Sequence, residues 1–440
     1  MSGQVNSLAV VAGQKELQDM RRRAILSCVI GNFMELYDFT LYGFFAIFIG
    51  HTFFPSTNPV VSLLSSLATF GVGFIMRPIG GLVMGAYADR IGRKGALIIT
   101  MAMMAIATGM PGITPGYATI GIWAPVILVL CRLAQGFSTG GEWGGAVIFL
   151  AEYAPPGRRG FYASWMQVGV AVGSLAGSGS AWILTATLDP ASLNSWGWRI
   201  PFLVGFLLLP IGYYLRTRVA ETPAFERLVE TRKVARAPIR DAFSSQKRMM
   251  GLVCGTSVIW NSGGYVLLVY LPVFANQVLK VDLSLALAAA AIGSVVRAIL
   301  TPPIGVLGDR IGRKAVIQTM NIGFLVLVYP MFLWMKTDPG FTSVLCTSVV
   351  AGVLMAMVAG AGPVMLTEQF PTRLRSTPVG IGYNISAAIF GGFAPFICTW
   401  LVRQTGDAIA PTYFLLGCAL VSLLTVTQLR DRTNVPLDEL

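Results

Sequence analysis

A ten-residue stretch that occurs twice in this chain decides its fold. Gly85-Ala-Tyr-Ala-Asp89-Arg90-Ile-Gly92-Arg93-Lys94 returns 220 residues later as Gly305-Val-Leu-Gly-Asp309-Arg310-Ile-Gly312-Arg313-Lys314. The same offset carries Arg77 onto Arg297, and a second repeat relates Glu152-x-x-Pro155-x-x-x-Arg159 to Glu368-x-x-Pro371-x-x-x-Arg375. Repeats in the same order indicate two related halves in parallel, as in many secondary transporters.

On both sides of the repeated stretch lie apolar runs of membrane-spanning length. The chain has 440 residues, of which 55% are hydrophobic and only 12% are charged, whereas a soluble domain has about 25% charged residues. A span needs about 20 mostly apolar residues. We therefore predict an all-α integral membrane protein with twelve transmembrane helices in two pseudo-symmetric six-helix bundles. The predicted spans are 24–49, 60–88, 95–112, 122–153, 161–187, 198–215, 249–274, 284–307, 315–335, 341–367, 376–402 and 411–429.

The placement of basic residues predicts the orientation in the membrane. With the N-terminus in the cytoplasm, 25 of the 32 lysines and arginines fall in cytoplasmic segments and four fall outside. This asymmetry follows the positive-inside rule, so we expect a multi-pass protein of the bacterial inner membrane with both termini cytoplasmic. The rule also explains the net charge of +12, and no DNA-binding motif accompanies it, so we expect no nucleic-acid partner.

The predicted boundaries give five segments. A cytoplasmic tail (1–23) precedes the first bundle (24–215), a linker (216–248) joins it to the second bundle (249–429), and a second cytoplasmic tail (430–440) follows. The linker carries nine basic residues, which could attract anionic lipid headgroups or form a solvated loop. The six cysteines lie in apolar stretches without a C-x-x-C pair, so neither a disulfide framework nor a zinc site is expected.

Several segments resemble the major facilitator superfamily. Both ten-residue loops match the most specific motif of that superfamily, and Arg132-Leu-Ala-Gln135-Gly136 resembles its fourth-helix motif. Within it the chain is similar to the metabolite:proton symporters, through segments that include Gly31-Asn-Phe-Met-Glu35-Leu-Tyr-Asp38-Phe39 and Gly140-Gly-Glu142-Trp-Gly-Gly145. The resemblance covers about residues 21 to 430. It implies proton-coupled symport by alternating access.

Charged residues within the predicted spans mark candidate functional sites, because ionisable groups in a membrane are costly. Three are acids and three are bases: Glu35, Asp38, Glu142, Arg77, Arg132 and Arg297. At about 1.5 Å per helical residue, four of them fall near mid-bilayer, where transporter sites usually lie. These four are Glu35, Arg77, Glu142 and Arg297.

The expected proton site is Asp38 with Arg132 as its partner. Related sugar porters pair a first-helix aspartate with the fourth-helix arginine, and these two residues match those positions. Burial raises the pKa of a carboxyl group and a nearby arginine lowers it, so small movements of the pair could load or release a proton. Glu35 and Glu142 complete the proton-coupling set. The single histidine, His51, falls at the end of a span, which disfavours a histidine relay.

The expected substrate contacts centre on Arg77 and Arg297, because the arginine fork binds a carboxylate in bidentate fashion. Arg77 could instead pair permanently with Glu35 or Glu142, whereas the spans of the second half contain no acid to neutralise Arg297. Aromatic and small polar residues could complete the pocket or simply pack between helices. They are Tyr37, Tyr42, Trp165, Gln167, Trp260, Asn261, Tyr265, Tyr383 and Asn384.

The repeated loops are the expected gate of the transporter. Asp89 at a helix end can accept hydrogen bonds and neutralise nearby arginines, and separating such buried pairs costs several kcal/mol. Simple anchoring by the loop bases is the alternative reading. The predicted gating residues are Gly85, Asp89, Arg90, Gly92, Arg93, Gly305, Asp309, Arg310, Gly312 and Arg313, together with Glu152, Arg159, Glu368 and Arg375.

These features predict proton-coupled uptake of a small organic carboxylate, with citrate or tricarballylate as first candidates by family similarity. Ketoglutarate, shikimate or an aromatic acid are alternatives. A betaine or proline symporter is a rival, although such relatives typically carry a C-terminal coiled coil and this sequence stops about ten residues after the last span. A non-transporting sensor is another. We expect a monomer without metal or cofactor, whose partners are the organic acid, protons and the bilayer. Neither a nucleophile–base set nor a nucleotide loop points to an enzyme.

Overall fold

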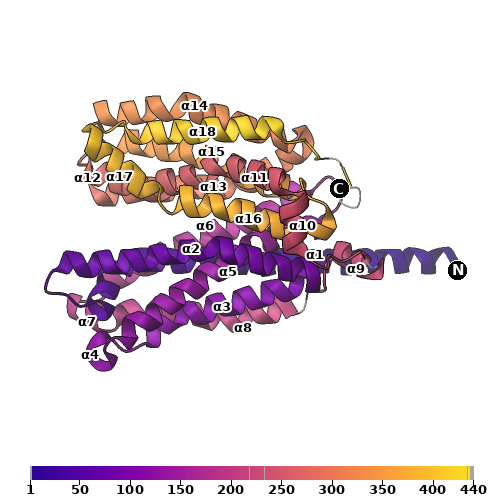
Figure 1. Ribbon diagram of the computed structural model, residues 1–440, viewed down its shortest axis with the longest axis horizontal. Coiled ribbons are helices and arrows are strands. Elements are labelled where there is room, and N and C mark those ends of the chain that lie inside the picture. The colour runs from indigo at the N-terminus through magenta and orange to yellow at the C-terminus, as the bar shows by residue number, and fades with distance from the viewer. Residues whose placement is uncertain (1, 218, 232, 434, 437–440) are drawn as a thin grey trace.

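The computed structural model describes residues 2–217, 219–231, 233–433 and 435–436, and this part of the chain contains helices and no strands. The N-terminal half, drawn from indigo to magenta in Figure 1, forms one bundle. Its long helices are α1 (Ser2–Phe53), α2 (Pro59–Ile91), α3 (Arg93–Ile113), α5 (Trp123–Tyr153), α6 (Arg159–Thr187) and α8 (Ile200–Thr217). Short elements α4 (Tyr117–Ile120), α7 (Pro190–Ser195) and η1 (Gly197–Arg199) lie in the connections.

The C-terminal half repeats this plan in the upper bundle of Figure 1. Two of its long segments are interrupted helices. The first comprises α11 (Lys247–Gly264), η2 (Tyr265–Tyr270) and α12 (Leu271–Gln277); the second comprises α16 (Ser376–Ser386), η4 (Ala387–Gly391) and α17 (Ala394–Thr405). The others are α13 (Leu283–Ile311), α14 (Arg313–Thr337), α15 (Phe341–Thr367) and α18 (Pro411–Gln428), with the 3₁₀ turn η3 (Thr372–Leu374) before α16.

The twelve long segments within the described residues coincide with the twelve predicted spans. Agreement is close for α5 and α15, predicted at 122–153 and 341–367. Ten of the segments are long and apolar enough to cross a membrane by length and composition. The other two, α5 and α6, each pack against helices on two sides, α5 against α2 and α3, and α6 against α1 and α13. Their polar and glycine-rich sequences fit that position.

The connecting and terminal segments also contain helix. The first predicted tail belongs to α1, which begins at Ser2 and extends beyond the bundle in Figure 1. The linker contains two short helices, α9 (Pro223–Glu230) and α10 (Pro238–Ser245), each with proline in its first turn, where the missing N–H costs nothing. Of the predicted tail 430–440, positions 434 and 437–440 lie outside the described residues.

Two π-helical turns interrupt the first and the fifth long segments of the C-terminal half. Each precedes a proline, Pro272 after η2 and Pro395 after η4. Proline lacks an N–H and clashes with the carbonyl group four residues earlier, which here lies in the π turn. Such turns are frequent at functional sites, and Tyr265 of η2 lines the cavity described below.

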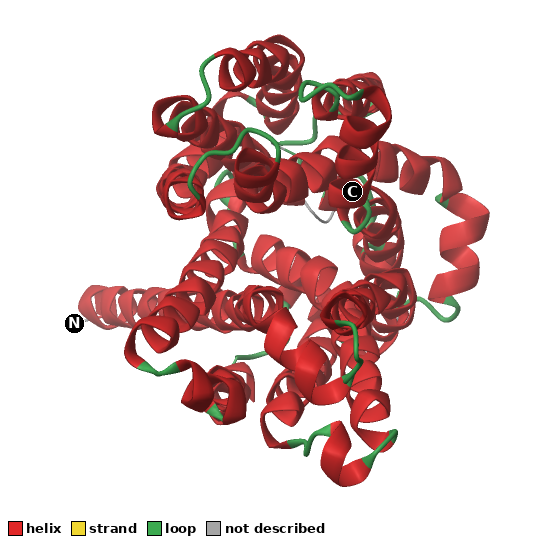
Figure 2. Ribbon diagram, turned by 90° about the vertical axis from the view of Figure 1, so that its left-hand side faces the viewer, coloured by secondary structure: helices red, strands yellow, loops and turns green. Residues whose placement is uncertain are grey.

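The two bundles meet along two related seams, α2 with α16 and α6 with α13. Figure 2 shows both bundles end-on. Glycines let the backbones approach at these seams: a Cβ atom on Gly85 would lie 2.9 Å from the Ser376 carbonyl oxygen, and one on Gly305 would lie 2.8 Å from the Gly160 carbonyl oxygen. We call the end of the molecule that carries both repeated loops the motif end, and the opposite end the far end.

Candidate functional site: a cavity between the two bundles

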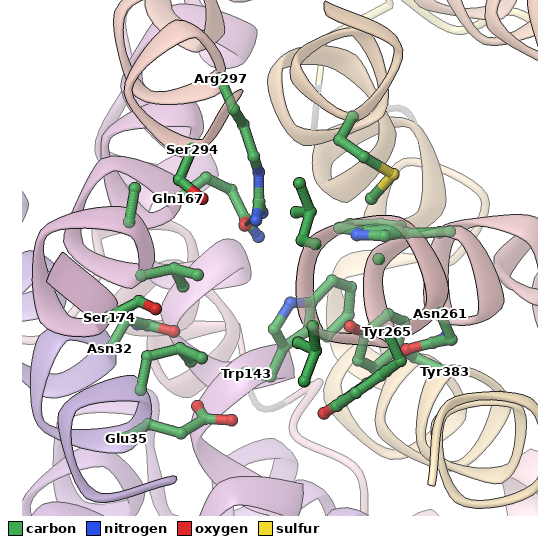
Figure 3. Close-up of a pocket in the computed structure, with 18 of the residues that line it drawn as sticks. Asn32, Glu35, Trp143, Gln167, Ser174, Asn261, Tyr265, Ser294, Arg297 and Tyr383 are labelled. Atoms are coloured by element: carbon green, nitrogen blue, oxygen red, sulfur yellow. Dashed lines mark hydrogen bonds between the residues drawn. The ribbon is translucent and has the colours of Figure 1, made fainter. Parts of the chain in front are cut away.

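A cavity of about 150 Å³ lies between the two bundles, roughly halfway along them (Figure 3). Helices α1, α2, α5 and α6 supply one wall, and α11, η2, α13, α15 and α16 supply the other. A dry cavity of about this volume can hold a small organic molecule such as benzene. The polar and aromatic lining residues are Asn32, Glu35, Arg77, Trp143, Gln167, Ser174, Trp260, Asn261, Tyr265, Ser294, Arg297 and Tyr383.

Among the residues that the structure describes, Arg297 is the cation of this cavity that has no acid beside it. It extends from α13, and one terminal nitrogen donates to Gln167 Oε1 at 2.8 Å across the interface between the bundles. Its Nε is buried without a hydrogen-bond partner among the described residues. A buried charge without a counter-ion is unfavourable, so Arg297 is ready to bind an anion.

Arg77 is already partly neutralised. Its guanidinium lies 3.6 Å from Glu35, which also lines the cavity. Its Nε donates to Asn384 Oδ1 at 3.4 Å, and Asn384 in turn donates to the Gly140 carbonyl oxygen at 2.8 Å. Asn384 thus ties α16 to α2 and α5 of the other bundle. In this conformation Arg77 therefore pairs with Glu35, as one of the two predicted alternatives has it.

Four aromatic side chains form one part of the cavity wall. The rings of Trp143 and Tyr383 are stacked, with centroids 3.5 Å apart and an interplanar angle of 7°. The Trp260 ring lies edge-on to both at 5.3 Å, and Tyr265 completes the set. Such a cluster offers π faces to a ligand, and π faces attract organic cations.

Asp38 and Arg132 form the pair that the sequence predicts. The two terminal nitrogens of Arg132 lie 2.8 and 3.2 Å from the two Asp38 oxygens, and both side chains are buried. The Tyr42 ring covers the guanidinium at 4.0 Å. The pair is not part of the cavity lining, but Asp38 follows Glu35 by one helical turn on α1, which links the pair to the cavity mechanically.

Glu142 has a partner that sequence reasoning missed. Arg216, counted there as a linker base, is buried at the end of α8 and forms a two-pronged ion pair with Glu142. Thr100 donates to the same carboxylate at 2.6 Å. The estimated depth placed Glu142 in one layer with Glu35 and Arg77, but Glu142 does not line the cavity. Its geometry indicates a structural role within the N-terminal bundle.

The motif end is closed by a charge network that repeats in the two halves. Asp89 accepts hydrogen bonds from the backbone N–H groups of Ser376 and Thr377 at the start of α16, at 3.0 and 2.8 Å. Asp309 accepts from Gly160 and Phe161 at the start of α6, at 2.8 and 3.0 Å. A carboxylate at a helix N-terminus is stabilised by the N–H groups and the helix dipole. Each aspartate thus clamps the opposite bundle.

Four arginines and two glutamates complete this network. Glu152 pairs with Arg375 of the other half at 3.2 Å, and Glu368 pairs with Arg159 at 2.8 Å. Within each half, Arg93 and Arg313 link the loop aspartate to the glutamate. Burial raises the pKa of Glu368, against the lowering effect of Arg313 and Arg159. We call Asp89, Arg93, Glu152, Arg159, Asp309, Arg313, Glu368 and Arg375 the gate network.

The remaining predicted gating residues fall into two groups. Gly92 and Gly312 are single-residue links between successive helices, with φ of +133° and +96°, values that favour glycine. Arg90 and Arg310 are exposed at the surface. Their positions fit the alternative role proposed for the basic residues of the loops, which is to anchor the loops on one side of the membrane.

The cavity includes seven of the eleven residues predicted for substrate contact or for the pocket wall: Arg77, Arg297, Gln167, Trp260, Asn261, Tyr265 and Tyr383. The other four do not line it. Tyr42 covers Arg132, and the Tyr37 hydroxyl donates to the Pro201 carbonyl oxygen at 3.0 Å within the N-terminal bundle. Trp165 packs edge-on against Phe161, and Asn384 joins the two bundles. Sequence reasoning missed Asn32, Trp143, Ser174 and Ser294, because a residue's rotation about its helix cannot be read without the neighbouring helices.

Comparisons with known proteins agree with this architecture. Residues 24–249 match the family model described as "Sugar (and other) transporter", and residues 284–437 match the model of the Major Facilitator Superfamily. The chain belongs to the major facilitator superfamily. As a member of that superfamily it is a multi-pass membrane transporter and not an enzyme.

Two relatives in the superfamily align over nearly the whole chain. A citrate-proton symporter of Klebsiella pneumoniae is 36% identical over 417 residues, which is 94% of this chain and 93% of that protein. A proline/betaine transporter of Salmonella typhimurium is 36% identical over 435 residues, 94% of this chain and 85% of that one. The solved structure of the proton:xylose symporter XylE bound to 6-bromo-6-deoxy-D-glucose has the same fold, with a TM-score of 0.79 at 17% identity and coverage of 96% and 98%.

Proposed function

We propose that this chain carries out proton-coupled symport of a small organic carboxylate by alternating access. Arg297 is the observation that supports this most directly. It is an arginine in the cavity between the bundles, and it forms no ion pair with any described residue. A carboxylate is the natural partner of such a group because it matches the guanidinium fork with two parallel hydrogen bonds.

The names of the relatives support a substrate with a carboxylate group, but they do not distinguish one carboxylate from another. One is named as a citrate-proton symporter and another as a proline/betaine transporter. Citrate, proline and betaine share a carboxylate group and differ in the rest of the molecule. A single arginine that anchors this group fits all three, and the remaining cavity residues would select among them.

A di- or tricarboxylate such as citrate or tricarballylate is our first candidate. Protonation of Glu35 would remove the partner of Arg77, which lies 3.6 Å away. Arg77 and Arg297 would then both present positive charge to the cavity, and a second substrate carboxylate would replace Glu35. This exchange offers a direct reason for symport, because the proton and the substrate anion would neutralise the same group of charges.

A zwitterion such as betaine or proline is the second candidate, and the aromatic wall favours it. Trp143, Trp260, Tyr265 and Tyr383 surround part of the cavity. Aromatic cages bind quaternary ammonium groups, while Arg297 would hold the carboxylate of the same molecule. In this case Glu35 would stay ionised and would add to the attraction for the cation.

The proposed cycle places the proton on Asp38 or Glu35. Protonation of Asp38 would release its bidentate contact with Arg132, and rotation of α1 would transmit that change to Glu35 one turn away. The positive-inside count puts the closed motif end in the cytoplasm, so this conformation would have its cytoplasmic side closed. We further propose a bacterial inner-membrane location, both termini cytoplasmic, and a monomer that needs no cofactor besides the proton.

Uptake into liposomes tests this proposal. Purified protein is reconstituted, an inward acid gradient is imposed, and uptake of radiolabelled citrate, tricarballylate, ketoglutarate, shikimate, betaine and proline is measured. We expect uptake of one class of carboxylate that a protonophore abolishes. Arg297→Lys keeps the charge but loses the fork, and should weaken binding of that substrate about 10- to 100-fold.

Three outcomes would overturn parts of the proposal. Uptake that Arg297→Lys leaves unchanged would contradict the assignment of the carboxylate anchor. Uptake insensitive to the protonophore and to the acid gradient would contradict proton coupling. Saturable binding of a carboxylate without uptake would show a sensor instead of a transporter.

A further inference from the structure

Trp143 is a cavity residue that takes part in neither the ion pairs nor the gate network. It lies on α5 directly after Glu142, yet Glu142 turns into the N-terminal bundle toward Arg216, while Trp143 faces the cavity. The Trp143 side chain is 3% exposed, and its indole N–H has no hydrogen-bond partner within the described part of the chain. Indole nitrogen can only donate, and a buried donor without an acceptor is destabilising.

The unpaired N–H lies on the cavity side of the ring. In Figure 3 the indole nitrogen of Trp143 is on the side that faces Arg297, with Tyr383 on the side away from it. The Nε of Arg297 is likewise unpaired. Two unsatisfied donors from opposite bundles thus border the same small cavity, and an anionic ligand between them would satisfy both.

The same ring joins the two bundles. Trp143 belongs to the N-terminal bundle, and Tyr383, on which it stacks at 3.5 Å, belongs to α16 of the other. Tyr383 follows Thr377, which Asp89 holds, by six residues, or about 9 Å along the helix. The stack therefore lies between the cavity and the gate network. It must separate when α16 moves away from α2 and α5.

We propose that Trp143 both binds the substrate and closes the cavity toward the motif end. Its indole N–H donates to the carboxylate that Arg297 anchors, and its ring forms the barrier below that carboxylate by stacking on Tyr383. This inference rests on the proposed function for the identity of the ligand. The barrier part stands on the ring geometry alone.

Two substitutions separate the roles. Trp143→Phe keeps an aromatic ring for the stack and removes the N–H, whereas Trp143→Leu removes both. Trp198→Phe is the matched control, because Trp198 is also a buried tryptophan whose indole N–H has no partner among the described residues. It lies in the far-end core between Phe53 and Phe202.

Binding of the six compounds of the uptake panel to the purified full chain is measured by calorimetry. We expect Trp143→Phe to raise the dissociation constant of the bound compound about tenfold or more, as for loss of a hydrogen bond to a charged group. Trp198→Phe should bind as the wild type does. Equal binding by Trp143→Phe and the wild type, with Arg297→Lys still impaired, would overturn the substrate contact and leave the proposed function intact.

Hydrogen–deuterium exchange over residues 376–386 tests the barrier without any ligand. We expect Trp143→Phe to exchange at nearly the wild-type rate and Trp143→Leu to exchange faster, because only the latter loses the stack. Equal rates in the two variants would overturn the barrier role. Failure of wild-type protein to bind any of the six compounds would overturn the carboxylate contact together with the proposed function, and this exchange measurement would still decide the barrier.

Discussion

At the scale of single residues, three buried arginines of the N-terminal half have three different environments. Arg132 is held by Asp38 in a bidentate pair, Arg216 is held by Glu142, and the contact of Arg77 with its acid, Glu35, is longer, at 3.6 Å. A tight pair resists change, since leaving one partner alone costs about 3–5 kcal/mol. The looser Arg77 pair borders the cavity and is the one that a ligand could most easily rearrange.

Asp38→Asn should abolish the accumulation of substrate against its gradient but preserve the exchange of substrate across the membrane. The amide keeps the shape of the side chain but cannot carry a proton, so uphill uptake driven by an acid gradient should fall to background. Counterflow of labelled substrate against unlabelled substrate should persist, because it needs no net proton movement. Gradient-driven accumulation by Asp38→Asn would show that the proton is carried elsewhere, with Glu35→Gln as the next variant to measure.

Glu142→Gln should affect stability more than coupling. Removing the carboxylate leaves Arg216 buried without its counter-ion, so the free energy of unfolding should fall by about 3–5 kcal/mol. The double variant Glu142→Gln/Arg216→Met should recover much of this loss, because it removes both charges. Thermal unfolding in detergent measures both. An unchanged melting temperature together with lost proton coupling would instead support the predicted coupling role of Glu142.

These residues show what the sequence could and could not reveal. The motif positions predicted the contact between Asp38 and Arg132, and the absence of acids in the second-half spans predicted the isolation of Arg297. The partner of Glu142 was missed because Arg216 stands at a helix end among linker bases. Its side chain turns back into the bundle, and sequence position alone does not show that direction.

At the scale of helices, glycines determine how closely the helices of the two bundles approach each other at the two seams. Gly85 and Gly305 come from equivalent repeat positions and contact backbone atoms of the opposite bundle. The repeat predicted their equivalence. It did not predict the π turns η2 and η4, because a proline after a spanning segment is compatible with a kink, a break or a widened turn.

Gly85→Ala and Gly305→Ala should each loosen the closed motif end. The added methyl group would lie 2.9 Å from the Ser376 carbonyl oxygen or 2.8 Å from the Gly160 carbonyl oxygen, so the helices must separate. Backbone amides at the start of α16 or of α6 should then exchange with deuterium faster. Gly417→Ala is the control, since its methyl group would meet no atom within 4 Å. Unchanged exchange in both seam variants would contradict tight packing there.

At the scale of the whole molecule, the repeat predicted two bundles and the apolar runs predicted twelve spans, and the described residues form two bundles with twelve long helical segments. The sequence was silent on which end is closed. That property depends on contacts between the halves, such as Asp89 with the start of α16 and Asp309 with the start of α6. The gate network uses the same residue types in both halves, so its two clamps should be similar in strength.

Asp89→Asn and Asp309→Asn should therefore open the motif end to similar extents. Each loses a charge-assisted contact with a helix N-terminus, and the double variant should open it further. Spin labels at the exposed positions 90 and 310, in a cysteine-free background, report the separation by pulsed electron resonance. A shift in one single variant alone would contradict the equivalence of the two clamps.

The most direct test of coupled movement is to let the substrate drive the proton. Liposomes containing the protein and a pH dye receive the transported carboxylate outside, with no initial pH gradient. We predict that the interior acidifies as substrate enters, and that Asp38→Asn and Arg297→Lys each abolish the change. Carboxylate entry with no change in internal pH would contradict the account, because it would show that proton and substrate do not move together.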